Sequence, residues 1–296
     1  MIRAMTAADV PAAMRLKDAA GWNQTAEDWR NLLAIEPRGC WVEEIDEAGA
    51  KTVAGSTTLV CYGRDLGWIG MVLVLPEFRG RGIARRLMEH ALGFAEENAV
   101  RCLALDATDM GWPLYRDLRF EDEAPIERWA LEVPPGSTQP ESPPEAETPR
   151  SDGVNPEQLG RAEQLAWMLE LDRLAFGADR SRVIEQIVRS GGPDVWVAPE
   201  GYLLSRPGSK ARFLGPCVAK ERRVAEAMIA ELLRGHPGET VFWDLLPANA
   251  AARELAESLG FRCARRLVRM SRPLSARQGT PQRIEWQFAT AGFEYG

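Results

Sequence analysis

Apolar and polar positions along the first 133 residues follow the pattern of a mixed sheet covered by helices. Short apolar runs rich in branched and aromatic residues predict strands, and stretches with apolar residues three or four apart predict helices. We expect strands at residues 2–5, 40–44, 52–62, 68–75, 102–107 and 128–133. We expect helices after Thr6 or Asp9, after a capping box at Thr25 and Asp28, and at residues 83–97 and 112–118.

The C-terminal part of the chain repeats much of this pattern. Strands are expected at residues 195–198, 202–206, 212–218 and 240–245, and helices at 165–176, 181–190, 222–233 and 249–259. The similarity is clearest between residues 114–120 and 255–261, because each segment reads as a short helix that turns at an aromatic residue into a strand. The repetition indicates an internal duplication at low sequence similarity.

Between the two patterned regions, residues 134–156 contain almost nothing that could enter a core and are dense in proline. This composition is typical of an extended, semi-rigid connector. A chain of 296 residues is also long enough for two domains of ordinary size. We therefore expect an α/β fold class with mixed sheets, in which domains at residues 1–133 and 157–296 are joined by a Pro-rich linker.

Composition and charge argue against several classes of protein. A formal net charge of −7 and a pI near 5.2 argue against nucleic acid as a partner, since such proteins are usually basic. No run approaches the ~18 apolar residues of a membrane span, and the N-terminus has no signal-peptide core, so we expect a cytoplasmic protein without a membrane partner.

The five cysteines show no CxxC spacing, which favours reduced, buried thiols. His90 and His236 have no metal-ligand or nucleophile pattern beside them, so no metal is expected.

The most informative segment is the loop Arg79-Gly80-Arg81-Gly82, which follows the apolar strand at residues 68–75 and opens the helix at 83–97. A strand that turns through glycines into a helix forms a nest of backbone N–H groups at the positive end of the helix dipole. The two glycines let the backbone approach an anion closely, and the two arginines can add charge-assisted hydrogen bonds. The sequence therefore predicts a site for a ligand that carries a diphosphate.

This segment, read together with its neighbours, resembles the acyl-CoA motif of the GCN5-related N-acetyltransferases (GNATs). Residues 74–84, Val-Leu-Pro-Glu-Phe-Arg-Gly-Arg-Gly-Ile-Ala, match a strand ending Val-x-Pro followed by Arg/Gln-x-x-Gly-x-Gly/Ala, and the likeness spans most of residues 40–131. The resemblance implies acetyl-CoA as co-substrate. The pantetheine and thioester would then contact Val72, Leu73 and Val74, and the pyrophosphate would contact Arg79, Gly80, Arg81, Gly82, Ile83, Ala84 and Arg85.

The same resemblance points to candidate catalytic residues. Tyr115 lies where the family often places a tyrosine that protonates the leaving thiolate, although a core aromatic is an equal alternative. Glu43, Glu44 and Asp106 are candidate general bases, and a solvated strand-end residue is the favoured interpretation of each. Thr108 stands where many relatives carry an asparagine that contacts the cofactor.

The C-terminal domain resembles a second, degenerate copy of the same fold. No glycine lies between Val218 and Ala225, where the phosphate loop would be, so we expect no pyrophosphate site there. This domain would then wall the acceptor pocket or act as an internal dimer partner. The segment Trp22-Asn-Gln-Thr25 joins two helices at a place where relatives shape the acceptor pocket, and packing of a loop is the alternative.

The function that we expect from this resemblance is that of an N-acetyltransferase. It would move an acetyl group from acetyl-CoA to a primary amine by direct attack in a ternary complex. The alternative is a non-catalytic acyl-CoA-binding or regulatory protein. A small-molecule amine is the favoured acceptor, with protein N-termini or lysines also open, and the acidic charge mildly favours a cationic amine. Monomer and homodimer both remain open.

Overall fold

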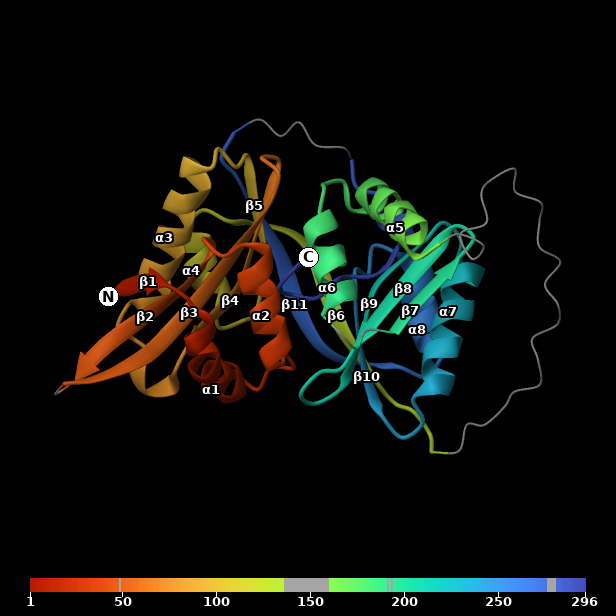
Figure 1. The fold of residues 1–296 in the computed structure, drawn as a ribbon, viewed down its shortest axis with the longest axis horizontal. Coiled ribbons are helices and arrows are strands. Elements are labelled where there is room, and N and C mark those ends of the chain that lie inside the picture. The colour runs from red at the N-terminus through yellow and green to blue at the C-terminus, as the bar shows by residue number, and fades with distance from the viewer. Residues whose placement is uncertain (48, 136–159, 191, 193, 276–280) are drawn as a thin grey trace.

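The computed structural model describes residues 1–47, 49–135, 160–190, 192, 194–275 and 281–296. The strands among these residues join one mixed, mostly antiparallel sheet with helices packed on it, so the expected α/β class is confirmed (Figure 1). The connector expected at residues 134–156 lies outside the described residues from residue 136 onward.

The N-terminal half contains β1 to β6 and α1 to α4. Its strands are β1 (Ile2–Ala4), β2 (Cys40–Glu47), β3 (Ala50–Tyr62), β4 (Leu66–Val74), β5 (Cys102–Ala107) and β6 (Glu121–Glu132). Its α-helices are α1 (Val10–Ala20), α2 (Ala26–Ile35), α3 (Ile83–Glu97) and α4 (Trp112–Asp117), with short 3₁₀ turns at Ala7–Asp9 and Pro76–Phe78.

The C-terminal half is built from the same kinds of element. Its helices are α5 (Arg161–Phe176), α6 (Ser181–Arg189), α7 (Arg222–Gly235) and α8 (Ala250–Ser258). Its strands are β7 (Asp194–Ala198), β8 (Gly201–Arg206), β9 (Arg212–Ala219), β10 (Thr240–Leu245), β11 (Arg262–Pro273) and β12 (Gln287–Ala289), and a 3₁₀ turn lies at Ile284–Trp286.

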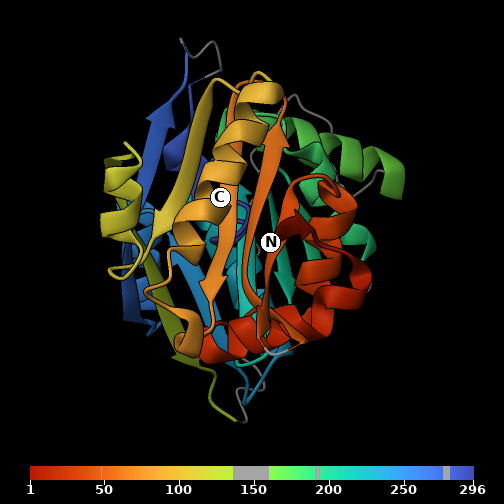
Figure 2. The same ribbon diagram turned by 90° about the vertical axis from the view of Figure 1, so that its left-hand side faces the viewer.

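Local sequence signals place the helices that surround the N-terminal sheet. The expected capping box forms at α2, where the Thr25 N–H donates to Asp28 over 2.7 Å and the Asp28 N–H donates to the Thr25 hydroxyl over 3.3 Å. The pair α1 and α2 lies on one face of the sheet and α3 on the other (Figures 1 and 2). Helix α3 comes very close to β3 at Gly55, where an added Cβ would lie 2.8 Å from Ile83.

The two halves exchange strands in the middle of the sheet. The strand order is β1-β2-β3-β4-β5-β11-β6-β10-β9-β8-β7, so β11 of the C-terminal half lies between β5 and β6 (Figure 1). Strand β11 runs antiparallel to β5 with Val268 opposite Ala107, and β6 runs antiparallel to β10 with Trp129 opposite Trp243. A single hydrogen-bonded sheet therefore passes from one half of the chain to the other.

The start of β6 differs from the expectation. The sequence predicts a strand only from residue 128, whereas the strand begins at Glu121. Residues 121–125 are largely exposed and carry acidic residues and Pro125, so they lack the apolar alternation that marks a half-buried strand. They are nevertheless in register with β11, where Pro125 lies opposite Val268.

A buried ion pair joins β5 to β11. Arg269 donates to both carboxylate oxygens of Asp106 over 2.9 and 3.0 Å, and its guanidinium lies 4.6 Å from the centre of the Trp68 ring. Both side chains of the pair are almost fully buried. The two charges therefore compensate each other across the boundary between the halves.

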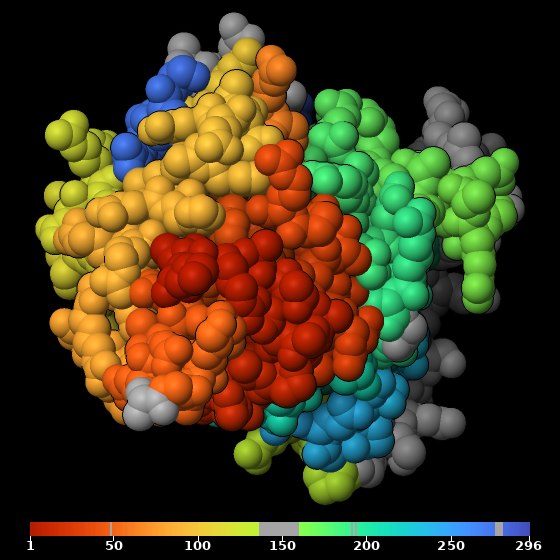
Figure 3. All heavy atoms as spheres, turned by 60° about the vertical axis from the view of Figure 1, so that its left-hand side comes forward, coloured from red at the N-terminus to blue at the C-terminus, as the bar shows by residue number. Residues whose placement is uncertain are grey.

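The last described residues lie between the two halves (Figure 1). The Tyr62 hydroxyl donates to the Tyr295 carbonyl over 2.6 Å, and the Trp68 indole donates to the Phe293 carbonyl over 2.9 Å. The flank of the N-terminal half is also covered, since Gln186 of α6 donates to Asn31 of α2 over 3.0 Å and the green helical segments abut it directly (Figure 3).

Replacing Arg269 by Met should lower the free energy of unfolding by about 3–5 kcal/mol, because it leaves the Asp106 carboxylate buried without its partner. Chemical denaturation measures the loss. The double variant Asp106→Asn with Arg269→Met should recover at least half of it, since neither charge then remains. A loss below about 1 kcal/mol for the single variant would show that the pair does not hold β11 in the sheet.

Candidate active site

The site begins where two parallel strands separate. Strands β4 and β5 are paired at Gly67 with Leu103 and at Trp68 with Ala104. Beyond these two pairs, β3 is the only strand partner of β4 in the described part of the chain. Met71 has a left-handed φ of 52° next to a register shift in the β3–β4 ladder. An irregularity of this kind bends a strand, and here β4 diverges from β5 toward its carboxyl end.

A cavity of about 1280 Å³ opens between the diverged strands and the loop that follows β4. Tyr115, the catalytic candidate, lines this cavity. So do most of the residues expected to contact the cofactor: Val72, Leu73, Val74, Arg79, Gly80, Gly82, Ile83, Ala84 and Arg85. Arg81 is placed elsewhere. It pairs with Glu47 over 2.6 Å and lies over the Phe78 ring, so its side chain contacts the β2–β3 hairpin rather than the cavity.

The loop has the backbone of an anion nest. Gly80 and Gly82 have φ values of 75° and 74°, in the left-handed region that glycine adopts at little cost. Gly82 precedes the first turn of α3, and no side chain caps that helix. Among the described residues no acceptor is bonded to the N–H groups of residues 83–85, all of which line the cavity. These N–H groups and the helix dipole favour a bound phosphate.

One of the candidate bases holds this loop in place. The Glu43 carboxylate is buried and pairs with Arg86 over 2.5 Å, and Arg86 also donates to the Arg81 carbonyl over 2.9 Å. Glu43 does not line the cavity. Its contacts therefore support the shape of the nest.

The other two candidate bases are also paired. Glu44 lies 2.7 Å from Arg3 and outside the cavity lining, and the Arg3 hydrogen bond lowers the pKa of Glu44. Asp106 lines the cavity, and burial raises its pKa while Arg269 opposes the rise. Of the three carboxylates, Asp106 is the one in contact with the cavity, and its oxygens are shared with Arg269.

Tyr115 has the surroundings of a proton donor. Its ring is buried against Phe120 and reaches the cavity, and no described residue is hydrogen-bonded to its hydroxyl. Gly111 makes room for the ring, because a Cβ there would lie 2.8 Å from the Tyr115 ring. Burial raises the pKa of Tyr115, so the hydroxyl keeps its proton at neutral pH. Thr108 lies beside it in the cavity wall, and its hydroxyl accepts from the Gly111 N–H over 3.2 Å.

Sequence reasoning allowed the C-terminal domain to wall the pocket but missed the residues that form this wall. Residues 263–266, at the start of β11, line the cavity together with β4, β5 and α4. The similarity between residues 114–120 and 255–261 indicates a strand after Phe261, but no local signal says which sheet neighbours that strand has.

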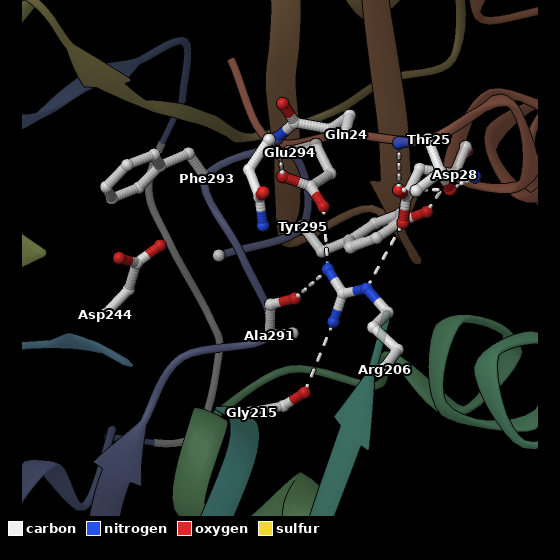
Figure 4. Close-up of polar contacts among 12 residues, drawn as sticks. Gln24, Thr25, Asp28, Arg206, Gly215, Asp244, Ala291, Phe293, Glu294 and Tyr295 are labelled. Atoms are coloured by element: carbon white, nitrogen blue, oxygen red, sulfur yellow. Dashed lines mark hydrogen bonds and ion pairs between the residues drawn. The ribbon is translucent and has the colours of Figure 1, made fainter. Parts of the chain in front are cut away.

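The segment between α1 and α2 is expected either to shape the acceptor pocket or to pack as a loop, and its residues differ in this respect. Trp22 lines the cavity, whereas Asn23 and Gln24 are buried and bind the C-terminal half. Gln24 donates to Glu294 over 2.8 Å, and Glu294 in turn pairs with Arg206, which also contacts Asp28 (Figure 4). The buried arginine thus fixes the position of the loop that carries Trp22.

The matching cleft of the C-terminal half is filled by the chain itself. Parallel strands β9 and β10 are paired from Arg212 with Val241 to Leu214 with Trp243. Beyond that point β12 pairs with β9, with Gln287 opposite Val218, and the Thr290 N–H donates to the Asp244 carbonyl over 2.9 Å. No residue from 216 to 235 has a positive φ, so the loop before α7 forms no glycine nest.

No group of three or more His, Cys, Asp or Glu side chains among the described residues could hold a metal ion. No helix in the described part of the chain is long and apolar enough to cross a membrane.

Comparison with known proteins matches both halves of the chain to one family. The model of the acetyltransferase (GNAT) family matches residues 11–120, and that of an acetyltransferase (GNAT) domain matches residues 168–285. A Bacillus subtilis protein, the uncharacterized N-acetyltransferase YitH, is 24% identical over 77% of this chain and 76% of its own length.

Solved structures share the whole fold. A Pyrococcus horikoshii protein provisionally described as an acetyltransferase has a TM-score of 0.79 at 23% identity, covering 100% of this chain and 95% of its own. A tandem GNAT protein from the clavulanic acid biosynthesis pathway has a TM-score of 0.63 at 17% identity, covering 93% and 99%. At these identities the likeness shows the fold.

The buried tyrosines predict an alkaline limit to stability. Burial raises the pKa of all four tyrosines of the chain, Tyr62, Tyr115, Tyr202 and Tyr295. In the unfolded chain they ionise near pH 10, so the unfolded state loses these protons first as the pH rises. The free energy of unfolding should therefore be unaffected by them below about pH 9 and should fall above about pH 10.

Absorbance of tyrosinate, recorded with circular dichroism across an alkaline titration, measures this behaviour. Ionisation should coincide with loss of structure. A tyrosine that titrates reversibly near pH 10 in the folded protein would contradict the burial described for these rings.

Proposed function

Because the chain belongs to the GCN5-related N-acetyltransferase (GNAT) superfamily, with two such domains in tandem, we propose that its N-terminal half transfers an acetyl group from acetyl-CoA to an amine. The family matches and the names of the relatives support an N-acetyltransferase. The observation that carries the proposal is one cavity in which the glycine nest, the diverged end of β4 and Tyr115 meet.

The nest and β4 suit the two parts of coenzyme A. The free N–H groups at residues 83–85 and the left-handed glycines match a pyrophosphate, with Arg79 and Arg85 at the rim of the cavity. Among the described residues, no strand lies beside β4 at residues 72–74 on the β5 side, so the backbone groups there can bond an extended pantetheine. This arrangement would bring the thioester toward the middle of the sheet.

The reaction then needs few groups from the protein. A neutral amine attacks the thioester carbonyl, a C–N bond forms, and the C–S bond breaks as the tetrahedral intermediate collapses. The departing thiolate takes the phenolic proton of Tyr115, which solvent restores, and the amine loses its extra proton to water. Each candidate carboxylate base is already paired with an arginine, so the proposal assigns no general base to the protein.

The pairing of those carboxylates is also the observation that favours the alternative, a non-catalytic acyl-CoA-binding or regulatory protein. Release of free thiol from acetyl-CoA across a panel of primary amines separates the two functions. Amine-dependent release supports transfer, and binding of acetyl-CoA without release for any amine class supports the alternative. We keep residues 1–133 as the proposed catalytic domain and 157–296 as the proposed degenerate one, and a small-molecule amine as the proposed acceptor.

Replacing Gly82 by Glu should weaken binding of coenzyme A by about 100-fold or more, because it places a carboxylate in the nest and a side chain at a φ of 74°. Isothermal titration calorimetry measures the affinity. The matched control is Gly63→Glu, since Gly63 has a φ of 62° in a turn with open space around it, remote from the cavity. Equal affinities of the two variants for coenzyme A would show that the nest does not bind the cofactor.

Replacing Tyr115 by Phe should lower kcat by about 100-fold while leaving the affinity for coenzyme A within about twofold. The ring still fills the space against Phe120 and Gly111, and only the transferable proton is lost. Steady-state kinetics with the best amine of the panel, together with calorimetry, separates the two effects. An unchanged kcat would show that another group protonates the thiolate.

A further inference from the structure

One arginine on the cavity wall has no hydrogen-bond or ion-pair partner among the described residues. Four arginines line the cavity, and three of them are already bonded. Arg85 pairs with Asp117 over 2.9 Å, Arg266 pairs with Glu127 over 3.1 Å, and Arg79 donates to the Val74 carbonyl over 3.2 Å. No side chain or carbonyl among the described residues accepts a hydrogen bond from the Arg265 guanidinium.

The strand register explains why Arg265 is left over. A bulge in β11 between Cys263 and Arg265 sets Arg265 opposite Arg128 of β6, so that two cations are cross-strand neighbours. Two carboxylates act on Arg265 through their charge. Asp244 is already held by Arg128 through two hydrogen bonds of 2.7 and 2.6 Å, and Asp109 lies in the cavity wall without an ion pair to Arg265 among the described residues. The two positive charges of Arg265 and Arg128 repel each other, and an anion bound beside Arg265 would offset this repulsion.

The charges and the partial burial around Arg265 also favour binding of an anion. Partial desolvation and then the Arg128 charge lower the pKa of Arg265, while the Asp109 and Asp244 charges oppose the change. Neither carboxylate forms an ion pair with Arg265 in the described structure. A partly desolvated guanidinium beside another cation gains most from a carboxylate or phosphate that enters the cavity.

The position of Arg265 separates it from the phosphate nest. Strand β11 lies next to β5, on the side away from β4, and pairs with it only from Val268 onward. Arg265 therefore lies beyond the carboxyl end of β5, with β5 between its strand and the strand that leads into the nest. The nest and β4 account for the pyrophosphate and pantetheine of the donor. Arg265 therefore lies where the second substrate would approach the thioester.

We propose that the acceptor amine carries a carboxylate, as amino acids and their derivatives do, and that Arg265 binds this carboxylate. This inference rests on the proposed function. The planar guanidinium presents parallel N–H donors that match the two oxygens of a carboxylate. The net charge of −7 favours a cationic amine at long range, but the unpaired arginine in the cavity is the local feature that selects the acceptor.

Matched pairs of amines test the proposal. Thiol release from acetyl-CoA is measured with α-amino acids and with the amines that lack the carboxylate, such as lysine with cadaverine, phenylalanine with phenethylamine, and tryptophan with tryptamine. At least one acid should have a kcat/KM about 10- to 100-fold above that of its decarboxylated counterpart. Replacing Arg265 by Gln should remove this preference, and Arg265→Lys should restore part of it.

The control variant is Arg262→Gln, which removes the same charge from the same strand at an exposed residue outside the cavity lining. It should leave the preference intact. A preference that survives Arg265→Gln, or that is lost equally in Arg262→Gln, would overturn the assignment of Arg265.

A second measurement separates the acceptor from the 3′-phosphate of coenzyme A. Calorimetry compares coenzyme A with 3′-dephospho-coenzyme A for the wild type and for Arg265→Gln. The affinity ratio of the two ligands should be the same in both proteins. A ratio that collapses toward one in Arg265→Gln would assign the arginine to the donor and overturn the proposal.

The outcomes also separate this inference from the proposed function. Amines without a carboxylate that react as fast as the acids would contradict the inference and leave acetyl transfer standing. Failure of every amine, with acetyl-CoA bound, would contradict both.

Discussion

The structure depends on one constraint: the backbone of two parallel strands that diverge must find other partners. Strands β4 and β5 separate after Trp68 and Ala104, and strands β9 and β10 separate after Leu214 and Trp243. In the C-terminal half β12 enters the gap and pairs with β9, and Thr290, directly after it, bonds the Asp244 carbonyl of β10. In the N-terminal half the gap is a cavity closed at one end by the glycine nest. The two halves therefore share a fold but differ in what lies beside the backbone groups that the diverging strands leave unpaired.

The exchange of β6 and β11 makes the cavity a joint product of both halves. Strand β11 is held beside β5 by the buried pair of Asp106 and Arg269, and its first residues form a wall that the N-terminal half lacks by itself. The loop that carries Trp22 is likewise fixed from the other half through Arg206 and Glu294 (Figure 4). In the proposed function, the C-terminal domain would therefore shape the acceptor side of the site without a glycine nest of its own.

Features set by local chemistry could be predicted from the sequence. The amphipathic pattern gives the bounds of α3, the capping box begins α2, and the spacing of Gly80 and Gly82 indicates the nest. Features set by distant pairing could not. Three such features are the ion pairs of Glu43, Glu44 and Asp106, the early start of β6, and the wall at residues 263–266. All depend on which elements distant in the sequence become neighbours. No residue-level signal carries that information.

The central claim is that one cleft of the pair receives coenzyme A and that β12 closes the other. The stoichiometry of a calorimetric titration of the full chain with coenzyme A tests it most directly. One molecule bound per chain is the result expected from the nest at Gly80 and Gly82 and from the insertion of β12 beside β9. Two molecules per chain, or none, would contradict the account.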